Sequence, residues 1–173
     1  TAVLQLAQAE LRLEADLDGA LERGEFVLFY QPIVSLASNQ IVGFEALVRW
    51  QHPVLGMILP LEFVPIAEEC GLIVPLGDWV LQTACKQNKT WHDLGLPPVR
   101  VAVNLSAAQF LYRDLMASVI RALETSRLDH VHLELEITEG ILMRETEVTI
   151  NTLRRLAELK KKLFAMGTTI DTT

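Results

Sequence analysis

Apolar residues recur along the chain in segments that alternate between helical and extended spacing. Residues 4–23 carry leucines at roughly helical spacing among Glu, Gln and Arg, and Gly24 follows, which predicts an amphipathic helix. The aromatic and β-branched run 26–34 and the apolar run 41–50 predict two strands. Asn39 lies in the polar stretch between them and supplies turn chemistry, so we expect a hairpin.

Helical and extended patterns continue to alternate downstream. After a loop at 51–60 we expect a short helix from Leu61 that Gly71 ends, a helix at about 76–94, a strand at 99–105, a helix at 111–123, a strand at 131–137 and a helix at 145–163. Such alternation indicates βα units around a parallel sheet, so the predicted fold class is α/β. A complete (β/α)8 barrel needs about 250 residues, and we expect this chain to stop after about the fifth strand.

Composition narrows the classes of function. Half of the residues are hydrophobic and 21% are charged, as in a soluble globular domain. The net charge of −7 argues against a protein that binds a nucleic-acid polymer. A small anionic ligand would have to be held locally, by a bound cation or a few arginines. No apolar run approaches the roughly 20 residues of a membrane helix, so we expect a cytoplasmic chain, although a longer parent protein could be tethered through other domains.

Three polar residues lie at or near the ends of predicted strands: Glu45, Asn104 and Glu136. In barrel enzymes these strand ends converge on the active site, and two carboxylates with one amide oxygen suit Mg²⁺ or Mn²⁺. The pattern alone leaves structural explanations open. Glu45 could pair with Arg49, Asn104 could cap the next turn, and Glu136 could face solvent.

Other reactive side chains have structural explanations. Ser106 lacks a His-Asp partner pattern and is expected to cap the next helix, while His52, followed by Pro53, is expected to organise a loop. Cys70 and Cys85 are interpreted as reduced core residues.

Several motifs carry a more specific signal, because they share one order and spacing. They are Tyr30-Gln31-Pro32-Ile33, Glu45-Ala46-Leu47-Val48-Arg49-Trp50, His52-Pro53, Gly56, Pro60, Phe63, Pro65, Ala67-Glu68, Gly71-Leu72-Ile73, Val103-Asn104-Leu105-Ser106 and Glu134-Leu135-Glu136-Ile137-Thr138-Glu139. In these motifs the chain resembles the N-terminal portion of an EAL domain, over about residues 20–166. The resemblance implies a TIM-barrel-like EAL fold and a cyclic di-GMP-specific phosphodiesterase that forms linear pGpG in bacterial second-messenger signalling.

The resemblance also assigns roles to individual residues. It implies that Glu45, Asn104 and Glu136 bind Mg²⁺ or Mn²⁺, with Glu45 and Glu136 serving catalysis, and that Glu139 supports a neighbouring catalytic loop. It implies that Arg49 holds a phosphate of cyclic di-GMP, which suits its donor fork, and that Gln31 faces the ligand.

The end of the chain departs from the family pattern. The family's aspartate pair after the fifth strand would fall at residues 167–168 if 164–166 form that strand, and no acid is there. Alternatively a longer helix ends near Gly167 and Asp171 is the first aspartate. The family's later catalytic groups, a lysine and a glutamate, are not among these residues, so we expect no activity from this fragment alone. The altered end of the chain also leaves open a degenerate EAL domain that acts as a non-catalytic cyclic di-GMP receptor or interaction module.

The resemblance extends to domain organisation. Residues 1–23 are similar to the linker helix that joins a GGDEF domain to an EAL domain, and residues 24–173 are interpreted as a partial EAL domain. The expected partners are cyclic di-GMP, an N-terminal GGDEF domain in the parent chain and a second copy in a homodimer.

Overall fold

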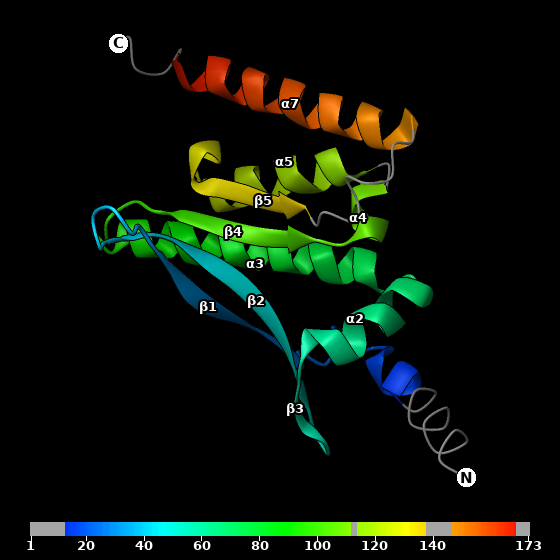
Figure 1. The fold of residues 1–173 in the computed structure, drawn as a ribbon. Helices are drawn as coiled ribbons and strands as arrows, with labels where there is room; N and C mark the ends of the chain where they lie inside the picture. Colours follow the sequence, from blue (N-terminus) through cyan, green and yellow to red (C-terminus); the bar gives the residue numbers. More distant parts are fainter. Residues whose placement is uncertain (1–12, 112–113, 138–146, 169–173) are drawn as a thin grey trace.

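A mixed sheet forms the centre of the structure, a computed structural model that describes residues 13–111, 114–137 and 147–168 (Figure 1). The strands are β1 (Phe26–Val34), β2 (Ile41–His52), β3 (Gly56–Ile58), β4 (Arg100–Leu105) and β5 (Leu133–Ile137). The helices are α2 (Pro60–Glu69), α3 (Ile73–Asp93), α4 (Ala107–Leu111), α5 (Leu115–Ser126), the 3₁₀ helix η1 (His130–His132) and α7 (Glu147–Thr168). None of the helices in these described ranges is long and apolar enough to cross a membrane.

The sheet has the order β1-β2-β4-β5, with β3 paired to β2. β1 and β2 form the expected antiparallel hairpin, and Asn39 adopts a positive φ of 53° in its turn. The pairings β2–β4 and β4–β5 are parallel, and helices lie in both connections. This confirms the α/β class, because parallel neighbours need crossover connections of this kind.

One face of the sheet forms the core against the helices. Side chains alternate between the two faces of a strand, and the buried set includes Ala46 and Trp50 in β2 and Val101 and Val103 in β4. This face packs on α3, which runs along the sheet in Figure 1. The residues that alternate with these along each strand therefore point to the opposite face, and the polar residues of the predicted site are among them.

The expected helix at 4–23 is wrong in its second half. Within the described part of this segment, residues 13–17 are helical and residues 18–24 form turns. Gly19 has a φ of +73°, which ends helical geometry. The guanidinium of Arg23 then donates to the backbone carbonyls of Asp16 and Asp18, at 2.6 and 2.9 Å, and so replaces helical partners of those oxygens.

Other boundaries also differ from expectation. The helix expected at 111–123 corresponds to α5, which begins at Leu115, and the short helix α4 before it was not expected. The strand expected from residue 131 begins with η1, where the Asp129 carboxylate accepts from the Val131 amide. The loop expected at 51–60 contains β3. Helix α7 continues to Thr168, so the register that makes 164–166 a strand is wrong, and Asp171 lies outside the described residues.

The two cysteines differ in environment. Cys85 is buried, as expected, whereas Cys70 is exposed at the C-terminal cap of α2. The core interpretation of Cys70 is therefore wrong, because the helix ends there and its side chain leaves the apolar layer. Both thiols are free.

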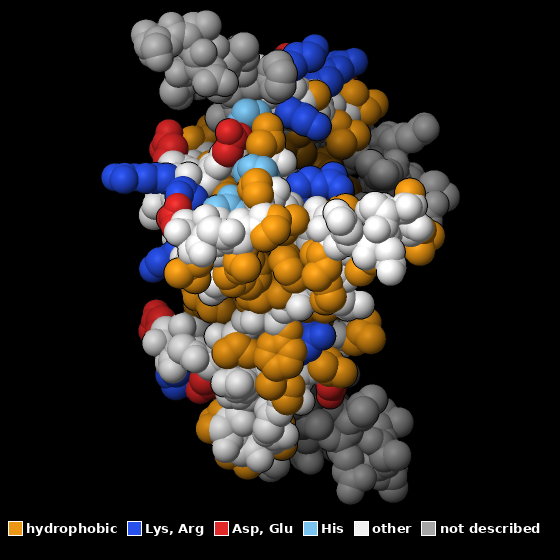
Figure 2. Space-filling model, turned by 90° about the vertical axis from the view of Figure 1, so that its left-hand side faces the viewer, with side chains coloured by type: hydrophobic (Ala, Val, Ile, Leu, Met, Phe, Trp, Pro, Cys, Tyr) orange, Lys and Arg blue, Asp and Glu red, His pale blue; other side chains and the backbone are white. Residues whose placement is uncertain are grey.

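Figure 2 shows the end of the molecule at the left of Figure 1, where hydrophobic side chains gather. The connections that lead into β2, β4 and β5 lie at this end, opposite the carboxyl ends of these strands. Leu36, Leu94, Leu96 and Val131 belong to these connections and are exposed. Of the polar residues discussed next, Asn104 and Glu136 lie toward the carboxyl ends of β4 and β5, whereas Glu45 lies within β2.

Candidate metal centre and ligand-binding face

The residues of the predicted site share the face of the sheet that does not pack on α3. In the register of the sheet, Gln31 is opposite Glu45, Glu45 is opposite Ala102, and Asn104 is opposite Glu136. Even spacing along each strand keeps Glu45 with Arg49 and Ala102 with Asn104 on that face. Parallel pairing thus brings together polar residues that are far apart in the sequence.

Glu45 and Asn104 are in direct contact. The Asn104 Nδ2 group donates to Glu45 Oε1 at 2.7 Å, across the β2–β4 pair. This bond uses the donor end of the amide and turns its carbonyl oxygen toward other partners. The arrangement fixes one carboxylate and one amide oxygen side by side. Arg49 donates to the Val48 carbonyl instead, and no ion pair joins it to Glu45 in the described part of the chain, so the structural alternative in which the two residues pair is wrong.

Glu136 completes the set from β5. Its pKa is raised, first because the carboxyl is partly removed from water and then because of the negative charges of Glu45 and Glu134. Carboxylates that repel each other on a partly desolvated surface are stabilised by a cation placed between them.

The donor chemistry of this set fits a hard divalent cation. Two carboxylates and an amide oxygen supply oxygen ligands of the kind that Mg²⁺ and Mn²⁺ prefer. In the part of the chain that the structure describes, no three His, Cys, Asp or Glu side chains form a metal-binding group. A cation held by Glu45 and Glu136 would therefore also need the amide oxygen of Asn104. Water, ligand oxygens or further protein groups would supply the remaining positions, because such a cation takes about six oxygens.

Arg49 lies on the same face, four residues along β2 from Glu45. Its Nη1 donates to the carbonyl oxygen of Val48 at 2.8 Å, and its guanidinium carbon lies 5.7 Å from the centre of the Phe29 ring. These two contacts restrain a half-buried guanidinium while leaving other N–H groups for an anion. Gln31 in β1 is exposed and lies opposite Glu45 on the same face.

Two residues on this face were not predicted as part of a site. Arg100 and Glu134 form an ion pair, with 3.1 Å between Nη1 and Oε2. Glu134 has a sequence signal, since it alternates with Glu136 on one face of the strand, whereas Arg100 follows only a proline-rich loop. Glu139, the predicted loop-supporting residue, lies outside the described residues.

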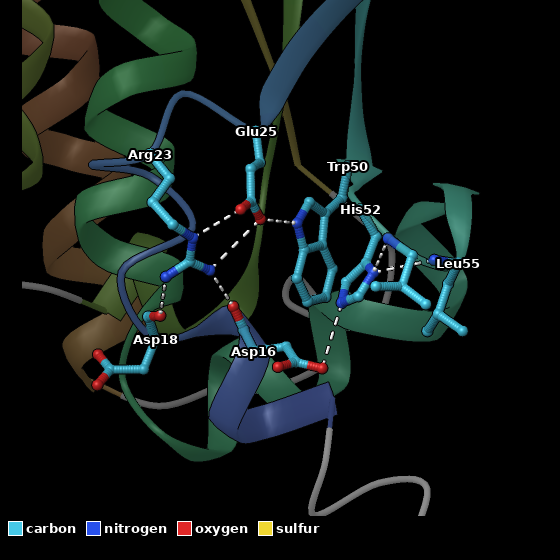
Figure 3. Close-up of polar contacts among 8 residues, drawn as sticks. Asp16, Asp18, Arg23, Glu25, Trp50, His52 and Leu55 are labelled. Carbon is cyan, nitrogen blue, oxygen red and sulfur yellow. Dashed lines mark hydrogen bonds and ion pairs between the residues drawn. The ribbon is translucent and has the colours of Figure 1, made fainter.

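A polar cluster connects the end of β2 to the segment that precedes β1 (Figure 3). Arg23 Nε and Trp50 Nε1 donate to the two oxygens of the Glu25 carboxylate, at 2.6 and 2.9 Å. These bonds, that of Arg23 first, lower the pKa of Glu25. Because Trp50 is fully buried and follows Arg49 directly, the cluster fixes the backbone on which Arg49 is carried.

His52 has the loop-organising contacts expected of it. Its Nδ1 accepts from the backbone amides of Val54 and Leu55, at 3.1 and 3.0 Å, and its Nε2 lies 3.2 Å from the Asp16 carboxylate. A nitrogen that accepts two N–H groups carries no proton, so Nε2 is the donor to Asp16. Figure 3 shows the ring between these partners, in a role that leaves it no free nitrogen for catalysis.

Comparisons with known proteins agree on one family. The family model described as "EAL domain" matches residues 14–165. The bifunctional diguanylate cyclase/cyclic di-GMP phosphodiesterase MucR of Pseudomonas aeruginosa is 45% identical over 153 residues, which are 88% of this chain and 22% of MucR. The cyclic di-GMP phosphodiesterase NbdA of the same organism is 42% identical over 157 residues, 91% of this chain and 20% of NbdA.

Solved structures show the same relationship. The PaMucR phosphodiesterase in complex with c-di-GMP has a TM-score of 0.81 at 44% identity, and the match covers 86% of this chain and 60% of that one. The FimX EAL domain from Pseudomonas aeruginosa bound to c-di-GMP has a TM-score of 0.74 at 26% identity, covering 87% of this chain and 58% of that one. EAL domains have a TIM-barrel-like fold, and this chain spans part of it. The sequence motifs, the parallel sheet and the comparisons together show that the chain belongs to the EAL domain family.

Proposed function

We propose that this chain is the N-terminal portion of a complete EAL domain that hydrolyses cyclic di-GMP to linear pGpG with Mg²⁺ or Mn²⁺. The observation that carries the proposal is the contact between Asn104 and Glu45, with Glu136 in register beside Asn104. It brings the donor set expected of a hard cation onto one face of the sheet, in a chain whose relatives are named cyclic di-GMP phosphodiesterases.

In this proposal Glu45, Asn104 and Glu136 bind the cation, which lowers the pKa of a water molecule and offsets negative charge on the phosphodiester. Glu45 and Glu136 serve catalysis through the cation that they would hold beside the phosphodiester. Arg49 binds a phosphate of the ligand through N–H groups that the contacts to Val48 and Phe29 leave available. Gln31, exposed beside Glu45 in the register, faces the ligand from β1.

The proposal extends to the protein that contains this chain. MucR is named as a diguanylate cyclase and phosphodiesterase, so we propose that the segment before β1 follows a GGDEF domain in a cytoplasmic, signal-responsive parent. Glu139 and Asp171 remain predicted contributors to the catalytic loops of that complete protein. A homodimer is the oligomeric state that we propose for it.

Hydrolysis by the complete protein tests this function. Conversion of cyclic di-GMP to pGpG, followed by chromatography, should require Mg²⁺ or Mn²⁺ and should stop with a chelator. Glu45→Gln should abolish turnover, because an amide supplies no charge to the cation. The matched control is Glu62→Gln, an exposed glutamate in the first turn of α2. Cyclic di-GMP binding without turnover in the unmutated protein would instead identify the non-catalytic receptor.

A further inference from the structure

The side chain of Gln109, in α4, fills the space beside Gly77, in α3. A Cβ atom built on Gly77 would lie 1.4 Å from Gln109 Nε2 and 2.3 Å from its Cδ. Gly77 is buried in α3, and Gln109, in α4, is 7% exposed. The Gln109 amide therefore fills the position that any side chain at residue 77 would take.

The same amide closes the turn between β4 and α4. Gln109 Oε1 accepts from the Ser106 backbone amide at 3.2 Å, and Ser106 Oγ accepts from the Gln109 amide at 3.2 Å. This reciprocal pair is a capping box, and Ser106 has the capping role expected from the sequence. Helix α4 spans Ala107–Leu111, too short to be stable by its own propensity, so the geometry of the turn depends on such contacts.

The turn begins immediately after the metal-binding position of β4. Asn104 is followed by Leu105, which is buried, and then by Ser106. Asn104 itself is exposed, so its direction depends on its hydrogen bond to Glu45 and on the backbone that carries it, rather than on packing around the side chain. The turn that follows Leu105 is one of the contacts that can shift this backbone relative to Glu45.

We propose that Gln109, seated against Gly77, is a positioning residue that aims Asn104 at the cation. The inference rests on the proposed function, because it assigns Asn104 to the metal centre. It adds to that function the requirement that residue 77 lack a side chain and that residue 109 present an acceptor to Ser106. Outer contacts that orient metal ligands typically change metal affinity by about 10- to 100-fold.

The test uses Gly77→Ala, Gln109→Ala and the double variant in the complete protein. In Gly77→Ala the new methyl group meets the far end of the flexible Gln109 side chain. We therefore expect the Gln109 amide to leave its place beside residue 77 while α3 and α4 stay packed. Gln82→Ala is the matched control, since Gln82 is a half-buried glutamine of α3 for which the described region shows no hydrogen bond. The readouts are hydrogen exchange of the Ser106 amide, Mn²⁺ affinity by calorimetry, and kcat and KM at saturating Mn²⁺.

Each single variant should accelerate Ser106 exchange by about tenfold, the worth of one hydrogen bond. Each should weaken Mn²⁺ binding by about tenfold or more while leaving KM for cyclic di-GMP within about twofold. The double variant should be no worse than Gln109→Ala, because the new methyl group fills the space that the amide vacated.

Two results would overturn the inference. Unchanged Ser106 exchange in Gln109→Ala would show that the amide does not hold the turn. Faster exchange with unchanged Mn²⁺ affinity would show that the turn does not position Asn104. If the unmutated protein bound no Mn²⁺ at all, the proposed function would fail, and the exchange data would separately report the Gln109 contact.

Discussion

Arg49 gives a quantitative test of how the ligand-binding face recognises phosphate. We expect Arg49→Ala to weaken cyclic di-GMP binding strongly and Arg49→Lys to restore part of the loss. Lysine keeps the positive charge but loses the planar fork, and with it the paired contacts to Val48 and Phe29 that orient the guanidinium.

The expected losses of affinity follow from the hydrogen bonds that the Arg49 guanidinium would donate to a phosphate and from its contact with Phe29. A hydrogen bond to a charged group contributes about 1.5–3 kcal/mol, and about 1.4 kcal/mol is a factor of ten in affinity. Arg49→Ala should therefore raise the dissociation constant by roughly 10- to 150-fold. Phe29 is 50% exposed, so its cation–π contact is worth about 0.5–1 kcal/mol, and Phe29→Leu should cost only about two- to fivefold.

Calorimetric titration of the complete protein with cyclic di-GMP, in Ca²⁺ to limit turnover, measures the series. Arg155→Ala is the matched control, because Arg155 is an exposed arginine of α7. The expected order of affinity is the unmutated protein and Arg155→Ala, then Phe29→Leu, Arg49→Lys and Arg49→Ala. Equal affinities for the unmutated protein, Arg49→Lys and Arg49→Ala would refute the assignment of Arg49 to a phosphate.

Two further predictions concern the fold around the site. Glu25→Ala leaves the indole N–H of buried Trp50 without its acceptor and should lower the free energy of unfolding by about 1–3 kcal/mol, measured by urea titration. Glu25→Gln, which keeps an acceptor oxygen, and Glu22→Ala, at an exposed site, should each cost less than about 1 kcal/mol, and equal losses in all three would refute this role. Burial raises the pKa of Cys85 to about 12, so at pH 8 its thiolate fraction is about one in ten thousand. A thiol reagent should modify exposed Cys70 and spare Cys85 until unfolding, and rapid labelling of both in the folded protein would contradict the buried position.

The sequence predicted the features that depend on the local order of apolar and polar residues or on short motifs. The hairpin followed from two β-rich runs around Asn39, and the parallel sheet followed from the alternation of strands and helices. The sequence also predicted that Glu45, Asn104 and Glu136 come together from neighbouring strands. The register places them on one face of the sheet, although Glu45 lies within β2 rather than at its carboxyl end.

The rest depended on contacts between distant segments. The turns at 18–24 exist because Arg23 can reach the carbonyls of Asp16 and Asp18 and the Glu25 carboxylate at once, which leucine spacing does not reveal. The role of Gly77 was similarly hidden, because a glycine within a helix becomes informative only when Gln109 is seen in its place. The Arg100–Glu134 pair required the β4–β5 register.

Anomalous diffraction from Mn²⁺-soaked crystals of the complete protein would show whether Glu45, Asn104 and Glu136 bind one divalent cation. We expect a manganese peak within coordination distance, on the order of 2.1 Å, of an oxygen from each of the three side chains, and loss of that peak in Glu136→Gln but not in Glu134→Gln. A peak that lies elsewhere, or one that contacts the protein without Glu45 and Asn104, would show that these residues do not form the metal site.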